Sequence, residues 1–232
     1  MRFKPYRVAS NQARSSDIVE IELDGVLKTG PGQPVFAWLP KGSEKPLAPA
    51  LHSPLTFIVK KKGVFSRALA SLQPGAVLYI RGSYGDRRKP PEAPSAGAGE
   101  FPIIMVVAGT GFATVSIMAL ELLASKRNVS SLVGMRDAYS PLLSNHAELM
   151  KITHIVADKG REGRVIEVFE TYLSNLDVRS TTVISAGHEP FMRRIVSIAS
   201  AAGIKHSDIL LSLERTMLCV LGSAAHAAAA GG

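Results

Sequence analysis

The sequence predicts two domains, the first built from antiparallel β-strands and the second from a parallel sheet covered by helices. Short segments of alternating apolar and polar residues occupy the first hundred residues. A segment rich in proline, glycine and small residues follows them. Beyond it, apolar strand-like segments alternate with helical ones, which is the order that produces a parallel sheet. A chain of 232 residues is long enough for both domains to have a core.

The first domain is assigned to residues 1–86. In Val19–Leu23 apolar and acidic side chains alternate, so this strand is predicted to bury one face and to expose the other. Turn formers such as Gly30-Pro31-Gly32 separate the strands. One short helix, 66–72, is predicted to begin at Ser66 as its N-cap. Strands are predicted at 19–23, 35–39, 55–60 and 77–81.

The second domain is assigned to 101–213, after a linker at 87–100 whose composition cannot bury enough apolar area to fold. Residues 214–232 are assigned to a segment of their own, which ends in the alanine-rich tail LGSAAHAAAAGG that we expect to fray. Strands are predicted at 103–107, 131–133, 152–157, 182–185 and 209–213, with helices at 113–125, 141–150, 165–173 and 190–202.

The composition excludes several kinds of protein. No apolar segment reaches the roughly 20 residues of a membrane-spanning helix, and the first residues lack the apolar stretch of a signal peptide, so we expect a cytoplasmic protein. Cys219 is the only cysteine, which excludes an internal disulfide, a multi-cysteine zinc site and a cysteine-held cluster within this chain. The histidines are scattered and no serine lies in a nucleophile-elbow pattern, which argues against a hydrolase.

The net charge of +8 is concentrated in one region, because residues 41–99 contain ten basic and three acidic residues. Such a region can attract a nucleic acid, a phosphate-rich cofactor or an acidic protein. Lysines 60–62 can equally be the solvated end of a strand. The charge alone leaves these alternatives open.

Two glycine turns follow predicted strands directly. Ala108-Gly109-Thr110-Gly111 precedes a helix, where free amides favour an anion such as a pyrophosphate, although Thr114 stands where the dinucleotide fingerprint has glycine. Gly187-His188-Glu189-Pro190 has the same position after a later strand. In a parallel sheet both turns open on the edge where ligands bind. Each can also be a simple strand-to-helix corner, with Pro190 at the first helical position.

Several segments, in this order and spacing, resemble the ferredoxin–NADP reductase superfamily and, within it, the electron-transfer subunits of dihydroorotate dehydrogenase. The resemblance covers nearly the whole chain and implies an N-terminal Greek-key β-barrel followed by a nucleotide-binding α/β domain. The segments are PGQPVFAWLP, PLTFIVKKKGVFSRALASLQPGAVLYIRGSYG, AGTG, VGMR, DKGREGRV, AGHEPFM and SLERTMLC.

In that family the barrel holds FAD, the second domain receives NAD(P)H, and a carboxyl-terminal cysteine segment holds a [2Fe-2S] cluster. This chain departs from the family at the cluster: Cys219 matches one cysteine, but Ala224 and Ala227 stand where the next two would fall. Alanine has no atom that can bind iron. The resemblance therefore implies a chain without its own cluster.

For FAD, the resemblance implies contacts at Lys45-Pro46-Leu47-Ala48, where the family has an arginine and a serine, and at Gly63 and Ser66, which match a phosphate-binding pattern. Lys45 keeps the charge but loses the planar fork of arginine, and Ala48 lacks the hydroxyl. We therefore expect FAD binding to be weakened.

For NAD(P)H, the resemblance implies the pyrophosphate loop Gly109-Thr110-Gly111, Arg136 on the adenosine side, and the nicotinamide-side turn at Gly187 and Glu189. The cysteine that precedes this turn in the family is Ala186 here, which disturbs the geometry for hydride transfer.

The leading hypothesis is an accessory subunit that assembles with a dihydroorotate dehydrogenase catalytic subunit, itself a flavoprotein, in pyrimidine biosynthesis. The expected state is a hetero-oligomer without a membrane partner. The alternative is an NAD(P)H:flavin oxidoreductase that retains FAD. A basic module that binds nucleic acid is the third and least favoured hypothesis.

Overall fold

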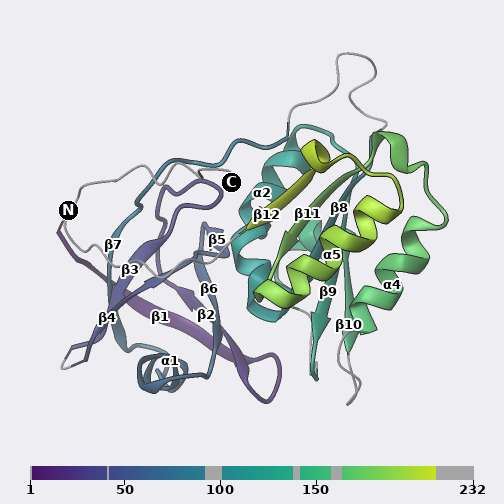
Figure 1. Ribbon diagram of the computed structural model, residues 1–232. Coiled ribbons are helices and arrows are strands. Elements are labelled where there is room, and N and C mark those ends of the chain that lie inside the picture. Colours follow the sequence, from purple (N-terminus) through teal and green to yellow (C-terminus); the bar gives the residue numbers. More distant parts are fainter. Residues whose placement is uncertain (1, 41, 92–100, 138–141, 158–163, 213–232) are drawn as a thin grey trace, which may run out of the picture.

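The computed structural model describes residues 2–40, 42–91, 101–137, 142–157 and 164–212. Within them the chain forms two sheets that lie in two adjacent domains (Figure 1). The first sheet is antiparallel and has the order β4-β3-β7-β1-β2-β6-β5. Its strands are β1 (Lys4–Ala13), β2 (Ile18–Leu23), β3 (Val35–Trp38), β4 (Glu44–Leu47), β5 (Leu51–His52), β6 (Leu55–Lys60) and β7 (Val77–Gly82).

This sheet curls around one apolar core, to which β1, β2, β3, β6 and β7 each contribute fully or nearly fully buried side chains. The predicted strands at 19–23, 35–39, 55–60 and 77–81 are confirmed. Strands β1, β4 and β5 were not predicted. β1 and β4 are rich in polar residues, and β4 carries Pro46, which is tolerated because β4 pairs on one side only.

The expectation that β2 exposes one face is wrong. Ile21 and Leu23 lie in the barrel core, while Ile18 and Glu20 on the other face are also buried, with exposed fractions of 3% and 6%. The second domain covers that outer face, so the alternation of apolar and acidic side chains separates two buried environments.

The short helix α1 (Val64–Ala70) begins earlier than predicted, with Gly63 as its N-cap. Ser66 lies inside the first turn, where its Oγ accepts hydrogen bonds from the backbone N–H groups of Lys62 and Gly63, each at 2.9 Å. The predicted N-cap position is therefore wrong, because this serine satisfies the preceding amides from within the helix.

The second sheet is parallel, in the order β10-β9-β8-β11-β12, as the strand and helix alternation predicts. The chain starts in the middle at β8, moves outward to β10 and returns to β11, so the strand order reverses between β8 and β11. Its strands are β8 (Ile103–Ala108), β9 (Val129–Met135), β10 (Thr153–Ala157), β11 (Thr182–Ala186) and β12 (Ile209–Ser212).

Helices cover both faces of this sheet. α2 and α3 share one apolar cluster, and α4 and α5 share the other. The helix predicted at 141–150 begins only at Ala147, because Leu143 has a φ of 52° and ends any helical path there. The helices are α2 (Phe112–Ala124), α3 (Ala147–Ile152), α4 (Arg164–Leu173) and α5 (Glu189–Ala201), and a 3-10 turn covers Gly109–Gly111.

The two domains share a core. The barrel residues Ile18, Ala50, Leu51 and Ile58 belong to the same buried cluster as α2, and the hydroxyl of Ser116 donates a hydrogen bond to the Ala50 carbonyl at 2.5 Å. The domains therefore pack through buried apolar area.

The described part of the predicted linker, residues 87–91, contacts both domains. Arg88 N–H donates to the Pro31 carbonyl at 2.9 Å, and Arg87 pairs with Glu121 of α2 at 2.6 Å. The remainder of the predicted linker lies outside the described residues, as do the tail and its cysteine.

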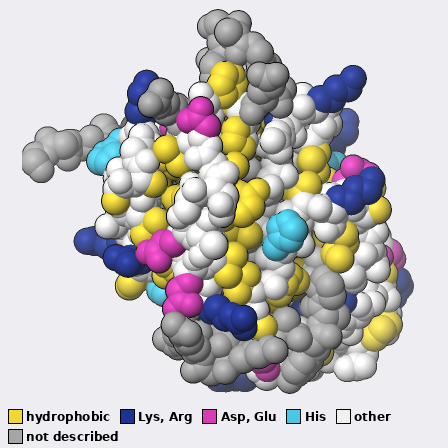
Figure 2. All heavy atoms as spheres, turned by 90° about the vertical axis from the view of Figure 1, so that its right-hand side faces the viewer, with side chains coloured by type: hydrophobic (Ala, Val, Ile, Leu, Met, Phe, Trp, Pro, Cys, Tyr) yellow, Lys and Arg dark blue, Asp and Glu magenta, His cyan; other side chains and the backbone are white. Residues whose placement is uncertain are grey.

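The face of the α/β domain that carries α4 and β10 is turned away from the barrel. Figure 2 shows a band of hydrophobic side chains on this face, flanked by charged ones. A hollow of about 390 Å³ on this domain is lined by α4 and the residues that follow it, and it lies away from both glycine turns. No helix in the described ranges is long and apolar enough to cross a membrane.

Candidate functional site between the two domains

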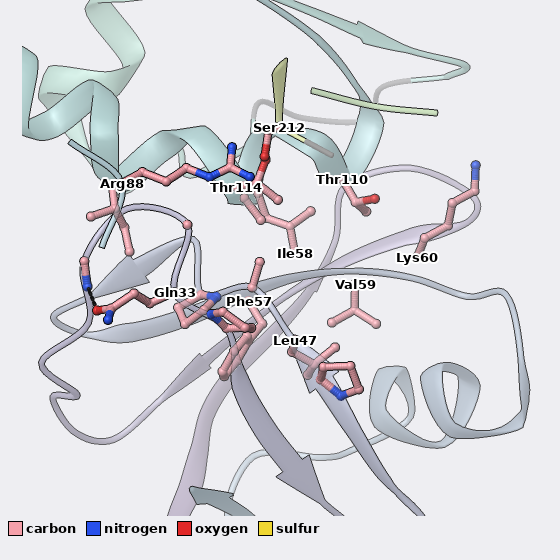
Figure 3. A pocket seen from close by; sticks show the side chains of 18 of the residues that line it. Gln33, Leu47, Phe57, Ile58, Val59, Lys60, Arg88, Thr110, Thr114 and Ser212 are labelled. Carbon is pink, nitrogen blue, oxygen red and sulfur yellow. Dashed lines mark hydrogen bonds between the residues drawn. The ribbon is translucent and has the colours of Figure 1, made fainter. Parts of the chain in front are cut away.

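A cavity of about 610 Å³ lies between the barrel and the α/β domain (Figure 3). One wall comes from the barrel strands β4 and β6 and the loop before β3. The opposite wall comes from α2, the turn before it and the end of β12. Lining residues include Ala48, Ile58, Lys60, Thr110, Thr114 and Ser212.

The Gly109–Gly111 turn forms part of this cavity through Thr110. Gly109 has a φ of 53°, in the region that favours glycine. A Cβ on Gly111 would lie 2.7 Å from the Ala186 carbonyl oxygen, so the turn after β8 touches the turn after β11. Thr114 donates its hydroxyl hydrogen bond to the Gly111 carbonyl at 2.8 Å, which secures the turn at the position where the fingerprint has glycine.

The two glycine turns therefore meet at the point where the strand order reverses, as we expect for neighbouring strands of a parallel sheet. Gly187 itself has a φ of 154° and lies next to Ala108 and Phe191. Glu189 is exposed at the start of α5, where it pairs with Arg193 at 2.6 Å. Gly187 and Glu189 do not line the cavity.

The end of the cavity near α1 is basic. Lys60 and Ser66 line it, and Lys60 pairs with Asp17 at 3.2 Å. A Cβ built on Gly63 meets nothing within 4 Å, so the residue before the helix faces open space. The Lys60 ammonium and the Ser66 hydroxyl together favour an anionic group at this end.

Strand β4 and the residue after it contribute Pro46, Leu47 and Ala48 to the lining. Lys45 is exposed and is not one of the lining residues. The structure thus brings three of the four predicted β4 contacts together with Ser66 and Thr110. Their role in cofactor binding stays a prediction.

Arg88 was missed by sequence reasoning. Its Nη1 donates to the Leu211 carbonyl at 3.3 Å, and in Figure 3 its side chain extends toward Thr114 and Ser212. A Cβ on Gly32 would lie 2.7 Å from the Arg88 Cδ, so the arginine side chain packs directly against the backbone of Gly32. No local pattern in the sequence indicates a contact between residues so far apart in the chain.

Other basic residues of the first domain have structural partners. Arg81 pairs with Glu44 and stacks on the ring of Phe36, 4.6 Å from its centroid. Part of the positive charge of residues 41–99 therefore stabilises the barrel. The cations that line the cavity, Lys60 and Arg88, lie at different ends of it.

Asp17, which pairs with Lys60, gives a testable pH dependence. Burial raises the pKa of its carboxyl, but hydrogen bonds from Lys60 and Ser15 and the charges of Lys60 and Arg136 outweigh burial and hold the pKa below its usual value. A lowered pKa stabilises the fold above the pKa of the unfolded chain, and this contribution is lost as the pH falls through the folded pKa.

We therefore expect Asp17→Asn to lower the melting temperature at pH 7, with a difference from wild type that begins to shrink below about pH 4 and disappears only below the lowered folded pKa. Thermal denaturation across this pH range measures it. Asp86→Asn, at an exposed position, is the matched control and should change little at any pH. A constant difference for Asp17→Asn down to the lowest pH would contradict the assigned ion pair.

No protein-family model matches the chain, but curated proteins resemble it. A Thermococcus kodakarensis protein named probable dihydroorotate dehydrogenase B (NAD(+)), electron transfer subunit, is 26% identical over 211 residues, which cover 90% of this chain and 82% of the relative. A Pyrococcus abyssi protein of the same name is 28% identical over 199 residues, which cover 83% and 70%. The predicted resemblance is confirmed.

Solved structures match the architecture. An NADH-dependent reduced ferredoxin–NADP oxidoreductase superposes with a TM-score of 0.73 at 19% identity, covering 91% of this chain and 77% of that one. The flavohemoglobin-like FAD/NAD-binding domain of nitric oxide dioxygenase from Vibrio cholerae O1 biovar El Tor gives 0.65 at 18% identity, covering 90% and 97%. The chain has the ferredoxin-reductase fold.

The lining of the interdomain cavity is compatible with FAD. It includes apolar side chains against which a flat ring can lie, and its α1 end offers Lys60 and the Ser66 hydroxyl for phosphate. A [2Fe-2S] cluster does not fit this chain, because four ligands are needed and there is one cysteine. Among the described residues, no three His, Cys, Asp or Glu side chains gather into a metal site.

Proposed function

We propose that this chain is an accessory, electron-transfer-type subunit of a dihydroorotate dehydrogenase complex in pyrimidine biosynthesis, without a [2Fe-2S] relay of its own. The observation that carries the proposal is the likeness to relatives of that name over 90% of this chain. The partner is then the catalytic flavoprotein subunit, and the assembly is a cytoplasmic hetero-oligomer.

Within this role, FAD and NAD(P)H are the cofactors that the chain would hold. FAD, when bound, exchanges electrons in steps of one or two. Pro46, Leu47 and Ala48 would lie along it, while Ser66 would donate a hydrogen bond to its phosphates and Lys60 would neutralise part of their charge. Gly109–Gly111 and Gly187 would admit a nicotinamide cofactor at the sheet edge, and Arg136 would approach its adenosine side.

Coexpression of the chain with the dihydroorotate dehydrogenase of its own genome tests the assembly. We expect the two to copurify at a fixed ratio, with flavin but without iron or acid-labile sulfide that belongs to this chain. A chain that stays a free monomer in its native extract would contradict the accessory role. Stoichiometric iron and sulfide on the isolated chain would contradict the missing relay.

A second candidate function is an NAD(P)H:flavin oxidoreductase that acts without the dehydrogenase. The observation in its favour is the size of the interdomain cavity, which is retained beside the two glycine turns. Purified chain loaded with FAD should then oxidise NADH or NADPH with an artificial acceptor and no partner. Absence of flavin absorbance after loading would remove this candidate.

Restoring the arginine and the serine of the family's flavin motif is predicted to raise the affinity for FAD. We expect Lys45→Arg combined with Ala48→Ser to tighten FAD binding by roughly tenfold, because a hydrogen bond to a charged group contributes about 1.5–3 kcal/mol and tenfold is about 1.4 kcal/mol. Equilibrium titration of the apoprotein by flavin fluorescence measures the change. Lys205→Arg, on the exposed surface, should leave affinity unchanged. Equal affinity of the double variant and wild type would show that these positions do not contact FAD.

A further inference from the structure

We propose that Arg88 faces the flavin ring in the interdomain cavity and raises the affinity of this site for reduced FAD relative to oxidised FAD. The inference rests on the proposed FAD site and adds to it a residue that sets how easily the bound cofactor is reduced. Among the described residues that line the cavity, Arg88 and Lys60 are the cations, and Arg88 lies at the end away from α1 (Figure 3). The distribution of charge along the cavity therefore has two separate centres.

Arg88 is held in place by groups from both domains. Its backbone N–H donates to the Pro31 carbonyl of the barrel at 2.9 Å, and its Nη1 donates to the Leu211 carbonyl of β12 at 3.3 Å. Its side chain also packs against the backbone of Gly32, where a Cβ would lie 2.7 Å from the Arg88 Cδ. The bond to Leu211 uses one N–H of the guanidinium, so its other N–H groups are available to a ligand.

The positive charge of Arg88 is not neutralised within the described part of the chain. Its side-chain partner there is a neutral carbonyl group, and no described carboxylate pairs with it. Lys60 differs in this respect, because it pairs with Asp17 at 3.2 Å. None of the described residues that line the cavity is acidic. The end of the cavity near Arg88 therefore favours negative charge on a ligand.

The order of the lining groups indicates which part of FAD would reach Arg88. Lys60 and Ser66 offer a cation and a hydroxyl for the phosphates at the α1 end. From Lys60 the lining continues along β6 through apolar side chains, and Figure 3 shows Ile58 and Ser212 between Lys60 and Arg88. With its phosphates at the α1 end, FAD would extend its ring along this apolar part toward Arg88.

A cation beside the ring matters because reduction changes the charge of the ring. A hydride from NADH or NADPH brings two electrons and one proton to the neutral oxidised ring, so the reduced ring has one negative charge and the nicotinamide is left oxidised. Arg88 would attract this charge and would donate hydrogen bonds to the ring oxygens, and both contributions are larger for the reduced state. Charge placed near the ring nitrogens is one means by which a protein tunes a flavin.

The test compares Arg88→Met, Arg88→Lys and the control Arg87→Met in the full chain. Arg87 carries the same charge, but it pairs with Glu121 and is not one of the lining residues. Fluorescence titration gives the dissociation constant for oxidised FAD, and anaerobic redox titration of bound FAD gives its midpoint potential, from which the constant for reduced FAD follows.

For Arg88→Met we expect the affinity for reduced FAD to fall about tenfold more than the affinity for oxidised FAD, which lowers the midpoint potential of bound FAD by about 30 mV. Arg88→Lys retains the charge and should recover part of this loss. Arg87→Met should have the midpoint potential of wild type. Because Arg88 is exposed, its replacement should leave the fold intact, which circular dichroism checks.

Three results would overturn the role of Arg88. In Arg88→Met, an unchanged midpoint potential would show that its charge does not act on the ring. An equal fall in Arg87→Met would assign the effect to the contacts that these arginines make with both domains. Wild-type chain that binds no FAD in either redox state would overturn the proposed site together with this role. Failure to copurify with the dehydrogenase, which counts against the accessory function, leaves the comparison of the Arg88 variants valid.

Discussion

Ala48→Trp is expected to weaken FAD binding by more than about 100-fold, which corresponds to about 2.8 kcal/mol. Ala48 lines the interdomain cavity, where it lies against the buried cluster shared with α2. An indole at this position would fill the space between the barrel and the α/β domain in which the flavin ring would lie. Equilibrium titration with FAD, followed by flavin fluorescence, measures the loss.

The control for this substitution is Ala124→Trp, at the exposed end of α2 and away from the cavity. It adds the same side chain without entering the site and should leave FAD affinity unchanged. Circular dichroism of both variants separates loss of binding from loss of fold. Wild-type affinity in folded Ala48→Trp would place the flavin outside this cavity and would remove the observation that favours the NAD(P)H:flavin oxidoreductase.

Gly111→Ala is expected to lower the free energy of unfolding by about 3 kcal/mol. The new Cβ would lie 2.7 Å from the Ala186 oxygen and 2.8 Å from its carbonyl carbon, and neither backbone atom can move without displacing β11. The turn after β8 would have to separate from the turn after β11. Urea denaturation followed by circular dichroism measures the change.

Gly109→Ala, two residues earlier, separates backbone strain from this clash. Its Cβ would meet only Ile18 Cδ1, at 3.7 Å, but its φ of 53° disfavours a side chain by about 1–2 kcal/mol. We therefore expect the smaller loss at position 109. Equal losses for both variants would contradict the close approach of the two turns.

The glycine turns show how far sequence reasoning reached in the site. Their position after apolar strands indicated the sheet edge, and the tertiary structure brings Gly111 against Ala186 there. Lys45 shows the limit: the motif placed it with Ala48, but only Ala48 lines the cavity. Alternation along a strand predicts which side chains share a face, and it does not predict what covers that face.

Helix ends were the least predictable elements. Ser66 was expected to be the N-cap of α1, but it lies inside the first turn and accepts hydrogen bonds from the N–H groups of Lys62 and Gly63, which precede the helix. The helix expected from residue 141 starts at Ala147, because Leu143 has a φ of 52°, and Leu142 and Leu143 pack into the buried cluster shared by the domains instead. In this second case tertiary packing overrides the local helix propensity. The two leucines are buried against residues that lie far away in the chain.

The sequence by itself determined the order of a β domain and a parallel α/β domain, because the period of the apolar residues changes at the linker. It also determined that the chain cannot hold a [2Fe-2S] cluster with its own cysteines, because the number of thiols is fixed by the sequence. Only the tertiary structure decided that Glu20 lies buried between the domains with Arg14 and the Leu143 amide, and that Arg88 reaches the interdomain cavity. A polar or charged side chain is buried where its partners are, and those partners come from positions that no local pattern connects.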